Sequence, residues 1–127
     1  MTGPTAVAQP SADSPGIAEL AGIPGAPSGL TVEEERRRRK TAVVGGYRIL
    51  SRFGLDEGIS GHITARDPEE PDTFWTAPFG RHFSQVRPEE LLLVGSDGTI
   101  LSGGGPLNRA AFVIHSKVHA ARPDVIG

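Results

Sequence analysis

Two stretches of sequence decide the fold that we expect: GISGHITAR at residues 58–66 and NRAAFVIHSKVHAARPD at residues 108–124. The first has two glycines and then alternates apolar with polar residues from His62 to Arg66, as a strand does. The second can begin a helix at Asn108, a residue type that commonly caps a first turn, and it ends at a proline. The sequence therefore predicts a loop that leads into a strand, and a later helix that carries two histidines.

The segments between and beside these stretches complete a small sheet. Residues 73–77 are rich in aromatic and β-branched types and should return antiparallel to the first strand. Residues 91–94 are all apolar, as in a strand buried on both faces, and the turn at residues 96–98 leads into a fourth strand at residues 99–101. Because short turns join these strands, the sheet should be antiparallel, with helices packed on it.

An earlier helix is predicted by a capping box, in which Thr31 and Glu34 satisfy each other's backbone N–H groups. Gly54 can end this helix in the left-handed conformation. Gly45 and Gly46 cost about 1 kcal/mol each in a helix relative to Ala, so a tightly packed neighbour is expected there. The inward face should carry the apolar residues at helical spacing, Val43, Tyr47, Leu50 and Phe53.

A run of basic residues, Arg36–Lys40, follows three glutamates in this helix. One interpretation is a surface for nucleic acid or lipid, and the other is a solvated helix face neutralised by its own acids. We favour the second, because the net charge of -2 gives no broad field that would attract an anionic partner. We therefore expect neither nucleic acid nor membrane as a partner.

Composition sets further bounds on the 127 residues. Residues 1–30 are rich in Pro, Gly, Ala and Ser, lack aromatic and basic residues, and are expected to be a disordered leader. No cysteine is present, so the chain has no disulfide or thiolate metal site. Neither a secretory signal nor a long apolar span is found, which favours a cytoplasmic location.

These motifs, with APFG at residues 77–80 and FSQV at residues 83–86 between them, resemble the N-terminal part of the class II aldolase/adducin family. The resemblance covers roughly residues 35–127 and rests on several motifs in the right order. It implies an α/β/α three-layer sandwich with a mainly antiparallel sheet. It also implies an apparently truncated domain over residues 31–127, in which Val125 and Ile126 look like the first residues of an interior strand.

The loop before the first strand is a candidate anion site. Gly58 and Gly61 free the backbone so that successive N–H groups can face one phosphate or carboxylate, and Ser60 and His62 add side-chain donors. The alternative is a tight turn that needs only its glycines. In sugar-phosphate aldolases of the family the matching loop contacts substrate phosphate, usually with Asn at the position of His62. In adducin-like members a His followed by Ile and Thr is usual, so the resemblance places this chain closer to that branch.

The resemblance adds a second substrate-side loop around Phe79 and Gly80, for which the alternative is a structural turn beneath Trp75. We expect the first loop to share a pocket with the start of the last helix. The candidate binding residues are Ser60, Gly61, His62, Phe79, Gly80, Asn108 and Arg109.

His115 and His119 are four apart on one helix, which can place two imidazoles on one metal, although such histidines are more often satisfied structural residues. In class II aldolases an acid lies four positions before the match of His115, and here that position is Ala111. The family's zinc ligands come from a His-x-His pair on the next strand plus a later His. We therefore assign no catalytic residue, no metal ligand and no cofactor in this chain, and expect Zn²⁺ or another divalent metal only in a full-length form.

Two classes of function remain open. One is metal-dependent aldolase or lyase chemistry on a small hydroxy-carbonyl substrate, with this fragment itself inactive. The other is a non-catalytic adducin-like binding or scaffold module of the cytoskeletal or actin-binding type. Ala111 and His62 favour the second, or a different reaction such as decarboxylation or epimerisation. Family members are commonly tetramers with sites between subunits, so the resemblance implies a homo-oligomer.

Overall fold

The computed structural model describes residues 29–127, so the leader predicted at residues 1–30 lies almost entirely outside the described residues. The elements in chain order are α2 (Val32–Arg52), β1 (Thr64–Arg66), β2 (Phe74–Thr76), η1 (Phe83–Gln85), η2 (Pro88–Glu90), β3 (Leu92–Val94), β4 (Ile100–Ser102) and α3 (Arg109–Ala121). Both η elements are single turns of 3-10 helix.

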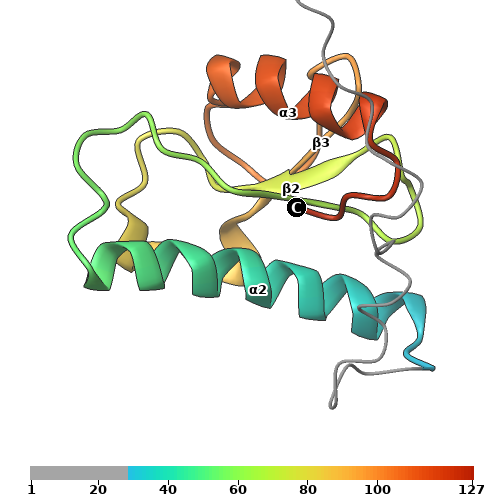
Figure 1. Ribbon diagram of the computed structural model, residues 1–127, viewed down its shortest axis with the longest axis horizontal. Helices are drawn as coiled ribbons and strands as arrows, with labels where there is room; N and C mark the ends of the chain where they lie inside the picture. Colours follow the sequence, from blue (N-terminus) through green and yellow to red (C-terminus); the bar gives the residue numbers. More distant parts are fainter. Residues whose placement is uncertain (1–28) are drawn as a thin grey trace, which may run out of the picture.

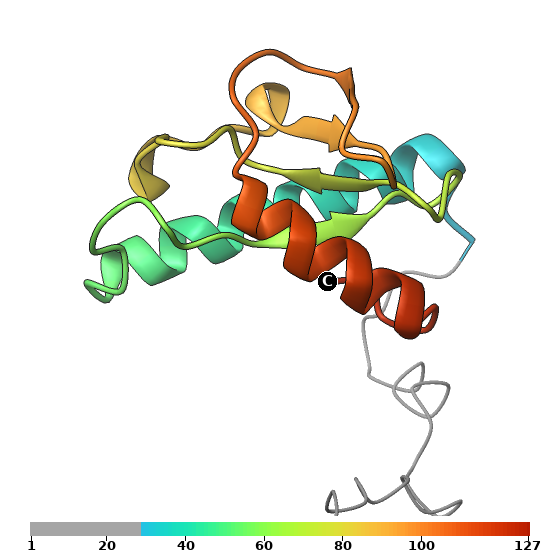
Figure 2. The same ribbon diagram turned by 90° about the horizontal axis from the view of Figure 1, so that it is seen from above.

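The four strands form one antiparallel sheet in the order β1-β2-β3-β4. Figure 1 shows α2 on one face of this sheet and α3 on the other, and Figure 2 shows α3 crossing in front of the strands. The predicted three-layer arrangement with an antiparallel sheet is therefore confirmed.

Two separate cores hold the three layers together. The core between α2 and the sheet includes Tyr47, Trp75 and Val86, all buried. The core on the α3 side is smaller and consists of Phe74, Leu92 and Val94, with Leu107 and Phe112 packed against it. Alternate residues of one strand enter different cores, since neighbouring side chains point to opposite faces.

The ends of α2 follow the predicted caps. The hydroxyl of Thr31 accepts a hydrogen bond from the backbone N–H of Glu34 at 3.3 Å, and the carboxylate of Glu34 accepts from the N–H of Thr31 at 2.8 Å. Gly54 follows the helix with φ +70°, which relieves the strain of a left-handed end. Both predictions are confirmed.

Of the two adjacent glycines in α2, Gly45 and Gly46, only Gly46 has the closely packed neighbour that was predicted for both. A Cβ on Gly46 would lie 2.9 Å from Cδ1 of Ile63, which is too close, so this helix position needs glycine to approach the residue before β1. Gly45 has nothing within 4 Å of such a Cβ, and the tight neighbour predicted there was wrong.

Two predicted side-chain orientations were also wrong, and the burial of β1 was not predicted. Phe53 is 73% exposed, because it lies at the C-cap, beyond the part of α2 that packs on the sheet. Val118 on α3 is 43% exposed rather than inward. All three residues of β1 are buried, because a helix covers each face of the strand and the polar side chains of Thr64 and Arg66 find partners inside.

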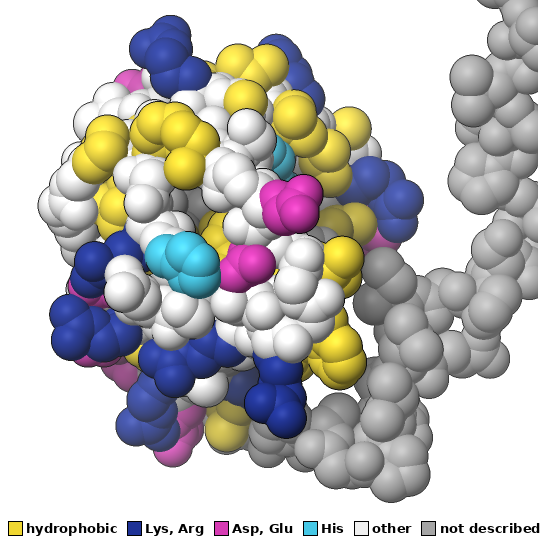
Figure 3. Space-filling view, turned by 90° about the vertical axis from the view of Figure 1, so that its left-hand side faces the viewer, with side chains coloured by type: hydrophobic (Ala, Val, Ile, Leu, Met, Phe, Trp, Pro, Cys, Tyr) yellow, Lys and Arg dark blue, Asp and Glu magenta, His cyan; other side chains and the backbone are white. Residues whose placement is uncertain are grey.

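The basic run of α2 is largely paired with carboxylates. Nε of Arg36 lies 2.8 Å from Oδ2 of Asp67, and Arg38 and Arg39 each place Nε 2.6 Å from a carboxylate oxygen of Glu35. Figure 3 shows one end of the molecule, where Lys and Arg side chains along the lower rim have acidic side chains among them. The expectation that no nucleic acid binds here stays a prediction.

The last described residues lie beside β1. The N–H of Arg66 donates to the carbonyl of Ile126 at 2.6 Å, so Val125 and Ile126 run along the strand edge without being assigned as a strand. None of the helices in residues 29–127 combines the length and hydropathy needed to cross a membrane.

Candidate functional site

Most of the predicted binding residues meet at one small cleft between the loop before β1, the loop after β2 and the start of α3. Its volume is about 10 Å³, which is about enough for one water molecule. Five of the seven candidates line it, namely Gly61, His62, Phe79, Gly80 and Asn108. Ser60 and Arg109 do not line it, and both are exposed.

Tyr47 of α2 fixes the first loop. Its hydroxyl accepts a hydrogen bond from the N–H of Ile63 at 2.8 Å and donates to the carbonyl of the same residue at 3.2 Å. Its ring packs edge to face on Phe83, with 4.7 Å between ring centroids. A Cβ on Gly61 would come within 2.6 Å of the ring of Phe83, so only glycine fits between this loop and η1.

The second loop is tied to the segment before α3. The N–H of Phe79 donates to the carbonyl of Pro106 at 2.8 Å, and Gly80 turns the chain with φ +82°. Asn108 then caps α3, since its Oδ1 accepts from the N–H groups of Ala110 and Ala111 at 3.0 and 3.2 Å. The predicted cap is confirmed, and it brings the amide of Asn108 to the cleft.

A line of polar side chains runs inward from the cleft between β1 and α3. Nδ1 of His62 lies 2.8 Å from Nε2 of His115, and Nδ1 of His115 lies 2.8 Å from Oγ1 of Thr64. The same hydroxyl lies 3.1 Å from Nε2 of His119, whose Nδ1 is 3.3 Å from Nη2 of Arg66. We call these five residues the histidine line.

Sequence reasoning missed the histidine line, because nothing in the spacing was seen to direct His62 toward His115. The structure corrects this. His62, Thr64 and Arg66 occupy alternate positions and so share one face, while His115 and His119 are one helical turn apart on α3. The histidine line could have been predicted from two patterns taken together. Polar residues recur at every second position of a strand, and two histidines lie four residues apart on a helix.

Burial keeps the inner histidines neutral. Desolvation and, to a smaller extent, the nearby His62 and His119 together lower the pKa of His115 to about 4. Desolvation also lowers the pKa of His119, with a smaller contribution from the positive charge of Arg66. At neutral pH both rings are therefore uncharged and each can donate one hydrogen bond and accept one.

The side chains present do not fit a resident metal ion. No group of three or more His, Cys, Asp or Glu that could hold a metal occurs within residues 29–127. The three histidines of the line point their ring nitrogens at one another and at Thr64 rather than at a common centre. Ala111, at the position where the sequence resemblance implies an acid, is fully buried in the first turn of α3 and offers no carboxylate.

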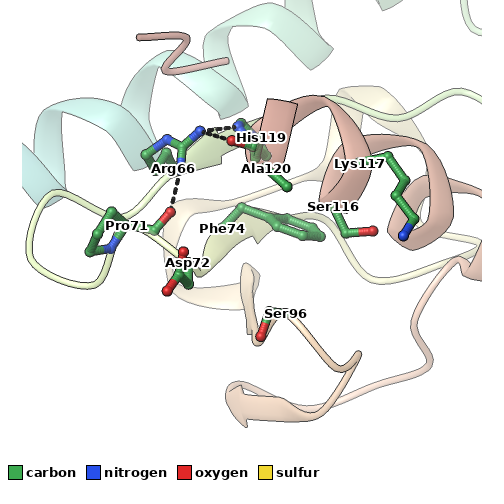
Figure 4. A pocket seen from close by; sticks show the side chains of 9 residues that line it. All are labelled: Arg66, Pro71, Asp72, Phe74, Ser96, Ser116, Lys117, His119 and Ala120. Atoms are coloured by element: carbon green, nitrogen blue, oxygen red, sulfur yellow. Dashed lines mark hydrogen bonds between the residues drawn. The ribbon is translucent and has the colours of Figure 1, made fainter. Parts of the chain in front are cut away.

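A second cavity, of about 160 Å³, lies at the inner end of the histidine line. Figure 4 shows Arg66 and His119 at one side of it and the ring of Phe74 across its floor, with Lys117 from α3 and Asp72 from the loop after β1 around it. No pattern in the sequence pointed to this cavity.

Known proteins share this architecture. The structure of L-fuculose 1-phosphate aldolase from Glaciozyma antarctica PI12 matches with a TM-score of 0.77 and 40% sequence identity, covering 84% of this chain and 45% of that one. Decarboxylase NovR of Streptomyces niveus is 39% identical over 97 residues, which are 75% of this chain and 36% of the relative. Alpha-adducin of Mus musculus is 40% identical over 81 residues, which are 61% of this chain and 11% of the relative.

The domain family described as Class II Aldolase and Adducin N-terminal domain matches residues 41–127. The chain belongs to this family, which confirms the resemblance noted in its sequence motifs. It spans less than half the length of each of the three relatives.

Proposed function

We propose that this chain forms the substrate-binding side of an enzyme with aldolase- or lyase-type chemistry on a small hydroxy-carbonyl compound. The observation that carries the proposal is the meeting of two glycine-containing loops and the Asn108 cap at one cleft. Similarity to a protein named as an aldolase and to one named as a decarboxylase supports it.

In this proposal the cleft residues bind an oxygen-rich group of the substrate. His62 and Asn108 supply side-chain hydrogen bonds, and the loop at Gly61 can turn backbone N–H groups to the ligand. The backbone at Gly80 can approach the ligand closely, because it carries no Cβ and nothing lies within 4 Å of that position. Ser60 and Arg109 flank the cleft and reach a bound ligand only if it extends outward. Since the cleft holds about one water molecule in this structure, binding a whole substrate requires the two loops to separate.

Aldolase chemistry of this class uses a divalent metal to polarise a carbonyl group. The described residues offer no ligand set for it, so we propose that Zn²⁺ or another divalent ion binds only where residues outside this part supply the ligands. A cytoplasmic homo-oligomer, with neither nucleic acid nor membrane as partner, completes the proposal.

A titration followed by NMR tests the cleft. Inorganic phosphate, glycolate and dihydroxyacetone at millimolar concentrations should shift the backbone signals of Gly61, His62 and Gly80. The His62→Gln variant should lose these shifts, whereas His82→Gln, which changes an exposed histidine outside the cleft lining, should keep them. Shifts confined to other surfaces, or none with any of the three compounds, would remove the cleft as a binding site.

A second candidate is a non-catalytic binding module like that of adducin. The specific observation in its favour is that Ala111, at the position where the resemblance to class II aldolases implies an acid, is a methyl group that is completely buried. The similarity to alpha-adducin supports it. Metal analysis of the full-length gene product, an activity screen on hydroxy-carbonyl compounds and co-sedimentation with actin filaments separate the two: the enzyme contains metal and turns substrate over, and the module does neither and sediments with filaments.

A further inference from the structure

The histidine line has Arg66 at its inner end and His62 at its outer end. The side chain of Arg66 can only donate hydrogen bonds, and His62 lines the cleft. Arg66 is 8% exposed. The guanidinium is held by backbone carbonyls: Nε donates to Val125 at 3.1 Å, Nη1 donates to Pro71, and Nη2 donates to His119 at 2.7 Å and to Arg122 at 3.1 Å. Figure 4 shows this anchored end of the line.

A guanidinium has five N–H donors and no acceptor. Nη2 of Arg66 has two hydrogens and lies near three acceptors, which are the carbonyls of His119 and Arg122 and, at 3.3 Å, Nδ1 of His119. A hydrogen on Nδ1 would point at these N–H groups, so we assign Nδ1 as the ring nitrogen without a hydrogen. A neutral imidazole carries one hydrogen, so the hydrogen of His119 is on Nε2. It points along the line toward Thr64.

The donor and acceptor of each following hydrogen bond can be assigned in the same way, from His119 outward to His62. Nε2–H of His119 donates to Oγ1 of Thr64, and the single hydroxyl hydrogen of Thr64 then donates to Nδ1 of His115. His115 consequently carries its hydrogen on Nε2 and donates it to Nδ1 of His62. Nδ1 of His62 is thus occupied as an acceptor, and its own hydrogen lies on Nε2.

We infer that Arg66, acting through His119, Thr64 and His115, fixes the direction of these hydrogen bonds so that neutral His62 presents Nε2–H to the cleft. Arg66 and Thr64 are positioning residues, since neither lines the cleft. The opposite direction would require an N–H on Nδ1 of His119 against the guanidinium. The two arrangements are therefore not equivalent, although every distance in the line permits either one.

This direction selects the chemistry that His62 can offer. Neutral His62 donates one hydrogen bond to an oxygen acceptor in the cleft, such as a carbonyl, carboxylate or phosphate oxygen. It does not receive a proton from a ligand unless the whole line reverses. The identity of that ligand rests on the proposed function, whereas the direction of the line does not.

Long-range ¹H–¹⁵N NMR of the imidazole rings tests the direction on the 127-residue chain, because the ¹⁵N shifts report which ring nitrogen carries the hydrogen. At about pH 8, above the ordinary pKa of histidine, His62, His115 and His119 should each show a single Nε2–H tautomer. Thr64→Val cuts the line and should leave His119 unchanged beside Arg66. His62 and His115 should then become mixtures of both tautomers.

Thr76→Val is the matched control. Thr76 pairs with Thr64 across the sheet and is equally buried, but its hydroxyl donates to the carbonyl of Ile63 at 3.1 Å, and the structure of residues 29–127 records no hydrogen bond from it to a histidine. This variant should keep all three tautomers, which separates a broken line from a general loss of packing.

Arg66→Gln tests the origin of the direction and should release His119 as well, provided that its amide spectrum shows a folded protein. If that variant does not fold, the comparison of Thr64→Val with Thr76→Val decides. A wild-type His62 with its hydrogen on Nδ1, or unchanged tautomers in Thr64→Val, would overturn the inference. Neither readout needs a ligand, so this result is independent of the titration that tests the proposed function.

Discussion

Asp67 links α2 to the sheet through a buried carboxylate. Its carboxylate is 1% exposed, yet it accepts hydrogen bonds from Arg36 at 2.8 and 3.1 Å and from Nε1 of Trp75 at 2.8 Å, and from the N–H groups of Glu69 and Glu70 at 3.0 and 3.1 Å. Burial acts to raise the pKa of Asp67, but these bonds outweigh it and hold the pKa well below its usual range.

Replacing Asp67 by Asn should therefore lower the free energy of unfolding by about 3 kcal/mol, because a buried charged pair loses one partner. Urea denaturation followed by circular dichroism measures this. The matched change Glu69→Gln, at an exposed partner of the same arginine, should cost less than about 1 kcal/mol. Equal losses in the two variants would show that burial of the Asp67 pair is not what stabilises it.

The depressed pKa of His115 predicts a dependence of stability on pH. Because the unfolded chain binds a proton below about pH 6.5 and the folded chain resists it until about pH 4, stability is fully present above the first value and falls between the two. The loss should reach about 2 kcal/mol, reduced from the full pKa difference because the ring is only half-buried.

Denaturation at a series of pH values checks this, with His115→Gln as the variant that lacks the titrating group. The slope between about pH 6.5 and 4 should be smaller in the variant, while the steeper fall below that window, due to carboxylates such as Asp67, should remain. An unchanged slope in the variant would assign the pH dependence to other groups.

At the scale of elements, the helices were the most predictable part. Both ends of α2 and the start of α3 depend on Thr31, Gly54 and Asn108, whose hydrogen bonds reach only two to four residues along the chain. The strand order was predictable because each strand pairs with its neighbour in sequence. The burial of β1 was not, because it depends on helices far away in the chain covering both faces of the strand.

The candidate site divides in the same way. The two loops and the Asn108 cap were found by resemblance of short motifs, and the structure brings five of those residues together. The line from His62 to Arg66 requires knowing that α3 lies against the outer face of β1, which no local pattern states. Contacts between segments that are far apart in the chain cannot be predicted from the local pattern of a single sequence.

The two adjacent glycines of α2 give a matched test of packing between elements. Gly45→Ala should raise the free energy of unfolding by up to about 1 kcal/mol, since alanine favours the helix and meets nothing. Gly46→Ala gains the same helix preference but must displace the end of Ile63, and it should be less stable than Gly45→Ala by about 1 kcal/mol or more. Thermal denaturation of both variants measures the difference, and equal stabilities would mean that Ile63 moves aside at no cost.

For the molecule as a whole, the outer surface of α3 carries exposed apolar side chains. Val113 and Ile114 are 57% and 52% exposed, and Val118 adjoins the same surface. Exposed apolar side chains grouped on one helix face favour association, in agreement with the homo-oligomer that we propose.

Sedimentation equilibrium should therefore show concentration-dependent association of the 127-residue chain. Ile114→Lys should weaken it, whereas Ile49→Lys, which places the same charge on a similarly exposed position of α2, should not. A monomer at all concentrations, or equal effects of the two substitutions, would show that the α3 surface does not drive assembly.

The contact between Gly46 and Ile63 has a consequence for how this family can diverge. Ile63 faces α2, while its neighbours His62 and Thr64 face α3. Positions on one face are therefore constrained by packing against α2, and positions on the other face by hydrogen bonds to α3. Across an alignment of relatives, side-chain size at position 46 should covary with size at position 63. Chemical type at positions 62, 64, 115 and 119 should covary as a second set, and a lineage can exchange one set while inheriting the other.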